Sequence, residues 1–243
     1  MTRTSRFLAL SGACAIALAT IVPTAAMAAD EGPSLARQGT GSAVDADNEF
    51  FAAYASALTG PKSIIGTFTV PALGSCSDGD EGIYTGIELA ADGGASYADG
   101  GVFSSCSAGT ATHNPVFDTT TADGQVPIDE VVEDGDKITV TNTFKRGNIK
   151  IKVENTTQGW IANDTFTGFT PDEAYNLYYS MTLGGVPLPP LSSDSAFKGV
   201  KVGGQALKAT SPTKYVLVDG AGDPIVKPTK IRGGTDFKFA YVG

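Results

Sequence analysis

The chain is poor in the residues on which several common chemistries depend. Its 243 residues include one histidine, one tryptophan, three cysteines and three methionines. The lone histidine, His113, argues against a histidine-based zinc site, and on the same ground we set aside Ser-His-Asp and Cys-His catalysis. We therefore expect neither a metal ion nor an organic cofactor.

Positive charge is also scarce. Seventeen Lys and Arg residues stand against 26 Asp and Glu residues, which gives a formal net charge of −9. Nucleic acids and anionic membranes are bound through basic surfaces, so we expect neither as a partner. The acidic turns at residues 78–81 and 133–136 could attract Ca²⁺, but neither matches a dedicated calcium-binding loop. The excess of acidic residues is typical of a protein that works at low pH, and it is equally consistent with a surface that only keeps the protein soluble.

Long apolar runs are absent apart from one at the N-terminus. Arg3 and Arg6 precede the uncharged stretch 7–22, and Ala26-Met27-Ala28 provides an A-x-A cleavage pattern. The stretch is shorter than the roughly 20 residues of a membrane-spanning helix. We expect residues 1–28 to be a bacterial Sec-type signal peptide and the mature protein to be secreted. Without Arg3 and Arg6, 15 basic residues remain against 26 acidic ones, a formal net charge of −11.

The cysteines fit the same compartment. Cys14 lies in the expected signal peptide, so Cys76 and Cys106 remain as an even pair. An oxidising compartment favours a disulfide between them, which closes a loop of about 30 residues.

What the sequence has in abundance is short strands separated by turns. A strand at 64–70 ends at Pro71, and two further β-rich runs, 82–89 and 95–104, flank the turn Asp92-Gly93-Gly94. Alternating apolar residues over 137–144, 148–154 and 160–166 predict an antiparallel meander. Many short strands with almost no helical period predict an all-β antiparallel sandwich.

The domain limits follow from the same pattern. We expect a flexible N-terminal arm over 29–62 and a single β-sandwich domain over 63–243. Within the arm, residues 48–58 could form a short helix, since Phe51, Tyr54 and Leu58 would share one face, or an extended edge strand. We favour the edge strand or an irregular segment.

The order of motifs resembles that of the eqolisins, the secreted glutamic peptidases whose fold is a β-sandwich of two long sheets. The matching pieces are Gly66-Thr67-Phe68-Thr69-Val70-Pro71, Gly86-Ile87-Glu88, Tyr97-Ala98-Asp99-Gly100-Gly101-Val102, Val132-Glu133-Asp134-Gly135-Asp136-Lys137-Ile138, Val153-Glu154-Asn155-Thr156-Thr157-Gln158-Gly159, Thr165-Phe166-Thr167-Gly168 and 234–242. The resemblance implies a two-sheet sandwich and an acid endopeptidase that takes peptide or protein substrates.

The resemblance also points to site residues. The family pairs a Gln with a Glu across a groove, and the Gln falls two residues before a Gly-Val pair, which places Asp99 there. The Glu lies early in the strand after the Thr-Phe-Thr-Gly turn. One alignment puts Tyr175 at that position, and a shift of two residues puts Glu173 there on the same sheet face. Asp99 with Glu173 would form a pair of carboxyls that share a proton.

Further residues could line the groove. Glu88 is a third carboxyl candidate, Tyr84 lies nearest to the position of a family Trp, and Tyr175 and Tyr179 share one face of their strand. Two functions remain open. The chain is either a secreted acid endopeptidase with an altered dyad, or an inactive relative that binds protein or polysaccharide in the same groove. We expect a monomer in either case.

Overall fold

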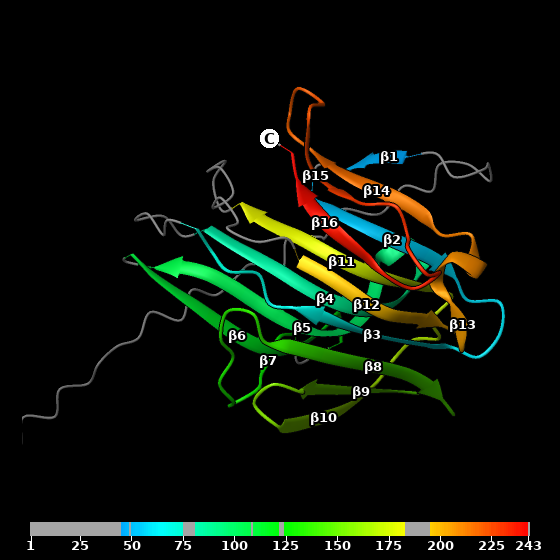
Figure 1. Cartoon of the computed structure of the whole chain (residues 1–243). Helices are drawn as coiled ribbons and strands as arrows, with labels where there is room; N and C mark the ends of the chain where they lie inside the picture. The colour runs from blue at the N-terminus through cyan, green and yellow to red at the C-terminus, as the bar shows by residue number, and fades with distance from the viewer. Residues whose placement is uncertain are drawn as a thin grey trace, which may run out of the picture. The chain divides into compact units, whose positions relative to one another are not determined.

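A computed structural model describes residues 45–48, 50–74, 81–107, 109–121, 124–182 and 195–242. Nearly all of their regular structure is β-strand (Figure 1). The strands are β1 (Asp45–Asn48), β2 (Phe51–Ala57), β3 (Ser63–Thr69), β4 (Glu81–Ala91), β5 (Ser96–Ser107), β6 (Thr110–Thr119), β7 (Val126–Pro127), β8 (Lys137–Lys145), β9 (Asn148–Asn155), β10 (Trp160–Thr167), β11 (Glu173–Thr182), β12 (Ser195–Val202), β13 (Gln205–Ala206), β14 (Thr213–Val218), β15 (Pro224–Pro228) and β16 (Phe237–Tyr241). Two short 3-10 helices, Asp92–Gly94 and Leu207–Thr210, complete the set.

The strands follow one hydrogen-bonded path that doubles back to make two layers. Its order is β10-β9-β8-β3-β12-β16-β15, followed by β14-β2-β11-β4-β5-β6-β7. Aromatic contacts between the two halves show how they pack. Phe166 of β10 lies against Phe117 of β6, and Tyr178 of β11 lies against Phe239 of β16. The result is the predicted all-β antiparallel sandwich.

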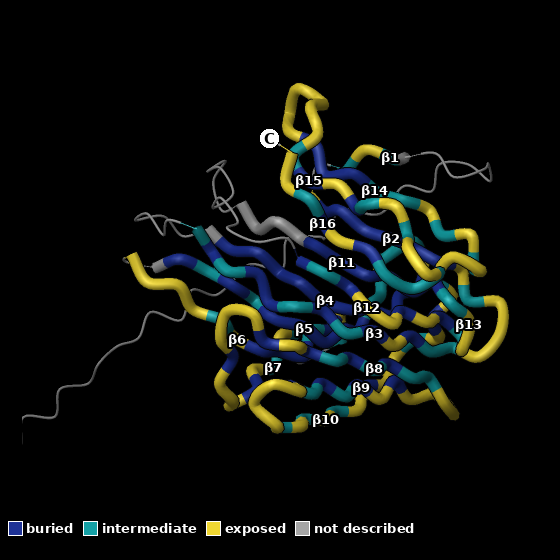
Figure 2. The backbone as a smooth tube through the Cα atoms, in the orientation of Figure 1, coloured by how far each residue is buried: buried dark blue, intermediate teal, exposed yellow. Residues whose placement is uncertain are grey.

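The core lies between the two layers, as the buried strand centres in Figure 2 show. In β4, Ile83, Ile87 and Leu89 are fully buried because they point toward the opposite layer. At Gly100 the two layers approach each other so closely that only glycine fits, because an added Cβ on β5 would lie 2.8 Å from a methyl group of Val153 on β9. The alternating period of the strands therefore sends one set of side chains into the core and leaves the other set for a second face.

Most predicted strands are found where the sequence placed them. The strand at 64–70 is β3, the paired runs are β4 and β5, and the meander is β8, β9 and β10. Asp92 and Gly93 of the predicted turn have positive φ angles of 55° and 68°, as a tight chain reversal requires.

The N-terminal boundary requires a correction. The segment expected to be an arm contains β2, which is neither helical nor an edge strand, because it pairs with β14 on one side and β11 on the other. Five consecutive residues from Phe51 to Ala55 are buried. The segment FAAYASA has no alternation of apolar and polar residues, because the strand is buried on both faces, and a period-2 pattern therefore does not mark it.

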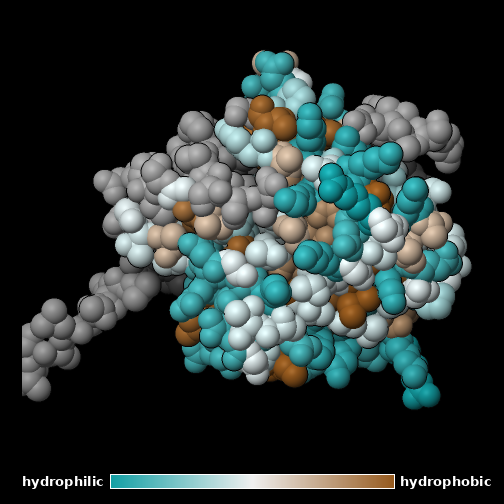
Figure 3. Space-filling view, in the orientation of Figure 1, coloured by the Kyte–Doolittle hydropathy of each residue, from teal (hydrophilic) through white to brown (hydrophobic). Residues whose placement is uncertain are grey.

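The face drawn in Figure 3 carries mostly polar side chains, with hydrophobic ones scattered among them. In the described part of the chain, neither of the short helices is long and apolar enough to cross a bilayer. The expected signal peptide, Cys76 and the proline-rich segment 186–191 lie outside the described residues.

Candidate active site

Four side chains form a row across neighbouring strands on the second face of the β11-β4-β5-β6 layer. The register places Tyr175 opposite Glu88, Glu88 opposite Asp99, and Asp99 opposite Asp118. Residues directly opposite one another in antiparallel strands share a sheet face, with Cβ atoms about 5 Å apart. Three carboxyl groups therefore meet on adjacent strands.

Each carboxyl reaches this face for the same local reason. In β4, Glu88 lies between Ile87 and Leu89, which both point into the core. In β5, Asp99 lies between Ala98, a core residue, and Gly100, which packs against the opposite layer. Strand alternation then turns both acids away from the core and toward each other.

Burial makes these carboxyls hard to ionise. Glu88 is 8% exposed and Asp99 is 3% exposed. Loss of solvation, followed by the charges of Asp118 and Glu173, raises the pKa of Glu88 to about 8. Loss of solvation, followed by the charges of Asp118 and Glu88, raises the pKa of Asp99 well above its usual value. The pKa of Asp118 is also raised by burial, although its hydrogen bond from the Thr119 backbone N–H opposes that shift. The row thus holds protons at pH values where exposed carboxyls are ionised.

Two tyrosine hydroxyls donate to carboxyls on this face. Tyr84 donates to Oδ1 of Asp99 at 2.5 Å, and Tyr175 donates to Oε2 of Glu173 at 2.7 Å. The pKa of each tyrosine is raised, first by burial and then by interaction with the carboxyl that accepts its hydrogen bond. Both tyrosines therefore stay protonated donors.

The sequence paired Asp99 with Glu173, but the structure places β4 between their strands. Glu173 is opposite Ala90, two residues along β11 from the row, and it accepts a hydrogen bond from the Tyr175 hydroxyl. Two carboxyls face Asp99 directly: Glu88 from β4, which the sequence ranked third, and Asp118 from β6. The reason is strand order, because the pairing of β11 with β4 rather than β5 cannot be read from the pattern of either strand.

The other candidates are also located. Tyr84 is buried beside Asp99, and Tyr175 occupies the end of the row. Tyr179 is opposite Tyr84 in the register. Asp118 was not among the candidates. Pro115 indicated an edge strand or a loop over 110–119, and the segment is strand β6, which runs straight through that proline. Cys106 is buried and disulfide-bonded, but its expected partner is outside the described residues, so the pairing with Cys76 stays a prediction.

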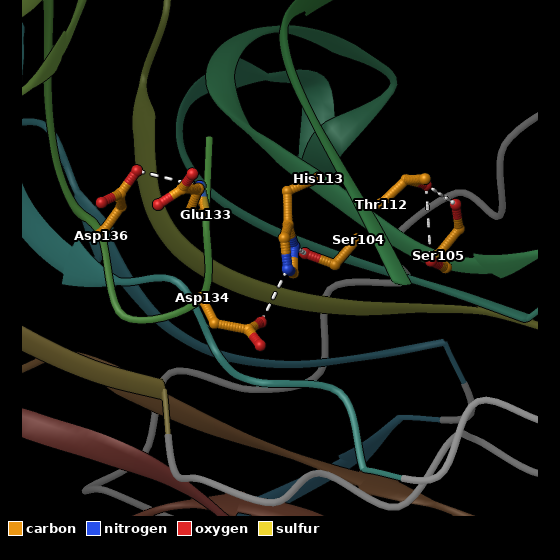
Figure 4. Close-up of polar contacts among 7 residues, drawn as sticks. All are labelled: Ser104, Ser105, Thr112, His113, Glu133, Asp134 and Asp136. Carbon is orange, nitrogen blue, oxygen red and sulfur yellow. Dashed lines mark hydrogen bonds and ion pairs between the residues drawn. The ribbon is translucent and has the colours of Figure 1, made fainter. Parts of the chain in front are cut away.

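A second polar arrangement lies away from the row and involves the only histidine (Figure 4). The ring of His113 is hydrogen-bonded through Nδ1 to Ser104 Oγ at 2.7 Å and through Nε2 to Asp134 Oδ1 at 2.8 Å. A Ser-His-Asp chain is thus present, although the single histidine had led us to set one aside. Ser104 is 1% exposed and lies on the core face of β5 with Val102 and Cys106, so its hydroxyl is not available to attack a substrate.

The described residues contain no group of three or more His, Cys, Asp or Glu side chains arranged to hold a metal ion.

Comparison with known proteins identifies the fold and the family. A family model described as the peptidase A4 family matches residues 52–177, just over half of the chain. The chain belongs to the peptidase A4 family, the eqolisins. The matched region contains β2 and the whole carboxyl row, so the row lies within the part of the chain that the eqolisins share.

Solved eqolisin structures have the same fold. Scytalido-glutamic peptidase, crystallised with a peptide-based transition state analog, aligns with a TM-score of 0.65 and 14% identity over 80% of this chain and 99% of that one. SCP-B, an eqolisin in complex with the tripeptide Ala-Ile-His, aligns with a TM-score of 0.60, 14% identity and the same coverage. Aspergilloglutamic peptidase from Aspergillus niger aligns with a TM-score of 0.52 and 18% identity over 66% and 99% of the two chains. A search of curated proteins found no match.

Proposed function

We propose that this chain is an acid endopeptidase in which Glu88 and Asp99 share one proton and together activate a water molecule. The observation that carries the proposal is their register, since the two acids face each other from adjacent strands inside the family's fold. Two buried carboxyls at this separation cannot both ionise easily, and one of them keeps a proton.

The chemistry needs one carboxylate and one carboxylic acid. In the singly protonated form of the pair, the carboxylate of Asp99, which accepts the hydrogen bond from Tyr84, takes a proton from water as the water oxygen bonds to the peptide carbonyl carbon. Glu88, whose pKa is about 8, gives its proton to the carbonyl oxygen. The tetrahedral intermediate then collapses. Asp99 gives the proton that it took from water to the amide nitrogen, Glu88 takes back a proton from a hydroxyl of the intermediate, and the C–N bond breaks, which leaves an acid and an amine.

The substrate class follows from the relatives. Two of the similar structures hold a peptide or a peptide-based analog, and a peptide is the ligand we propose here. We also propose that the protein acts outside the cell after removal of residues 1–28, that Cys76 and Cys106 are paired, and that the protein works as a monomer without nucleic acid or membrane. These proposals rest on the sequence.

A peptide-binding role without hydrolysis is the second candidate. Phe51, Tyr175 and Tyr215 form an aromatic cluster on the same face, with ring centroids 6.5 Å and 5.4 Å apart for the pairs that include Phe51. Aromatic rings of this kind provide contact area for a chain that is held but not cut.

The test is incubation of the secreted protein with an unfolded protein from pH 3 to pH 8, with new chain ends identified by mass spectrometry. New internal ends that increase with time at acidic pH and disappear above about pH 8 are the expected result. The carboxyl-to-amide variant Glu154→Gln is a matched control, because Glu154 pairs with Lys152 on β9 in the other layer. Binding of the unfolded protein with no new ends at any pH would support the second candidate.

A further inference from the structure

The ring of Tyr84 lies over two glycines that face each other across β4 and β5. An added Cβ at Gly86 would lie 2.5 Å from the Tyr84 hydroxyl oxygen, and one at Gly101 would lie 2.4 Å from the same atom. Gly86 and Gly101 are directly opposite in the register. The space that two side chains would occupy is therefore filled by one tyrosine ring.

The position of the ring over Gly86 and Gly101 directs the Tyr84 hydroxyl to one oxygen of Asp99. Asp99 lies two residues before Gly101 on the same face of β5, and Tyr84 lies two residues before Gly86 on β4. The ring spans the glycine pair and ends with its hydroxyl 2.5 Å from Asp99 Oδ1. Tyr84 is only 6% exposed, so the ring has no room to swing into solvent.

We propose that Tyr84 is a positioning residue that makes Glu88 and Asp99 unequal, with Asp99 held as the proton acceptor and Glu88 left as the proton donor. The strand pattern and the register treat the two facing carboxyls alike. The hydroxyl of Tyr84 makes them different, because it donates a hydrogen bond to Asp99. A hydrogen bond from a neutral donor favours the ionised form of the carboxyl that accepts it.

Other acidic groups surround the pair and raise the pKa of Asp99, which opposes the effect of the Tyr84 hydrogen bond. Glu88 faces Asp99 from β4 and Asp118 faces it from β6, while Glu173 of β11 acts on Glu88. Burial and these negative charges raise the pKa of Asp99, and the hydrogen bond from Tyr84 opposes that rise. Removal of the hydroxyl should leave Asp99 still harder to ionise.

The direct test is the titration of Asp99 in the intact protein, followed by ¹³C NMR of its carboxyl carbon. In Tyr84→Phe the midpoint should rise by about one to two pH units, the range that a hydrogen bond to a charged group provides. Gly86→Ala should have the same effect, because the three atoms nearest to its methyl carbon all belong to Tyr84, at 2.5–2.6 Å, and the ring would have to shift. Tyr178→Phe is the matched control, since the Tyr178 hydroxyl is buried on the other face and has no hydrogen-bond partner.

The role in turnover rests on the proposed function and has a separate readout. In Tyr84→Phe the acidic limb of the kcat–pH profile should move upward by the same amount as the Asp99 midpoint, with KM nearly unchanged. An Asp99 midpoint that is the same in the parent, Tyr84→Phe and Gly86→Ala would overturn the proposal. The NMR titration decides this even if the protein cleaves nothing, so failure of the positioning role and failure of the peptidase role are distinguishable.

Discussion

Glu88 and Asp99 face each other from adjacent strands with exposures of 8% and 3%, so two acids share a site that water barely reaches. An apolar pair would be more stable at that position, because burying a charged group without a counter-ion is costly. No basic side chain contributes to the pKa of either acid. In the proposed mechanism the two acids share one proton, which lowers the cost of burying them and is also what a pair of acids needs in order to activate water.

The first prediction concerns stability as a function of pH. Glu88 has a pKa of about 8 when folded against 4.5 for a free side chain, so the folded protein holds more protons between these values. Stability should be greatest below about pH 4.5 and should fall as the pH rises to about 8, by up to about 1.4 kcal/mol per pH unit for each proton. Melting temperatures measured across this window check the slope. The variant Glu88→Gln should have a shallower slope, and an unchanged slope would contradict the account.

The second prediction concerns a buried polar link outside the site. Asn155 Nδ2 donates to Asp136 Oδ2 at 2.7 Å, and Asn155 Oδ1 accepts from the backbone N–H groups of Thr157 and Gln158. Asn155→Ala should destabilise the protein by about 1–3 kcal/mol, because it removes a hydrogen bond to the buried carboxyl of Asp136 and leaves two backbone N–H groups of the turn without their acceptor. Urea unfolding measures the loss. Asn163→Ala, at an exposed position of β10, should stay within about 0.5 kcal/mol of the parent.

The third prediction concerns the Ser-His-Asp chain. The hydroxyl of Ser104 is buried between the layers, and its bond to His113 joins β5 to β6. Ser104→Ala should lower the melting temperature by a few degrees and leave peptide hydrolysis unchanged. A fluorophosphonate probe, which labels active serines, should not react with the parent protein. Labelling at Ser104, or loss of hydrolysis in the variant, would show that the chain has a catalytic role.

The fourth prediction concerns the cysteines. Peptide mapping under non-reducing conditions should find Cys76 joined to Cys106 in the secreted protein. Cys106→Ser should reduce stability by roughly 3–4 kcal/mol, since the crosslink restricts a loop of about 30 residues in the unfolded chain. A free thiol at Cys106 in the secreted protein would refute the pairing.

The sequence was informative where a local pattern determines structure. The meander from β8 to β10 follows directly from alternation, because Ile149, Ile151 and Val153 are all buried while Lys150 is not. β2 was misread because its alanines carry no alternation. A strand with two buried faces shows no period, and only pairing with β11 and β14 defines it.

The site was harder to predict because it depends on strand order. Glu88, Asp99 and Asp118 come from three strands, and each looks like an ordinary acid in its own segment. The resemblance to the eqolisins pointed to Asp99, whereas register placed Glu88 rather than Glu173 opposite it. Which residues meet across a sheet is set by non-local pairing, which a single sequence does not reveal.

The most direct test of the central claim is a comparison of kcat/KM for peptide hydrolysis at acidic pH among the parent, Glu88→Gln, Asp99→Asn and Glu173→Gln. Loss of a general acid or base should cost about 10²–10⁴-fold. The account predicts that loss in Glu88→Gln and Asp99→Asn, and a much smaller effect in Glu173→Gln, with all four proteins folded. Full activity in Glu88→Gln together with loss in Glu173→Gln would contradict the account and return the site to the pairing of Asp99 with Glu173.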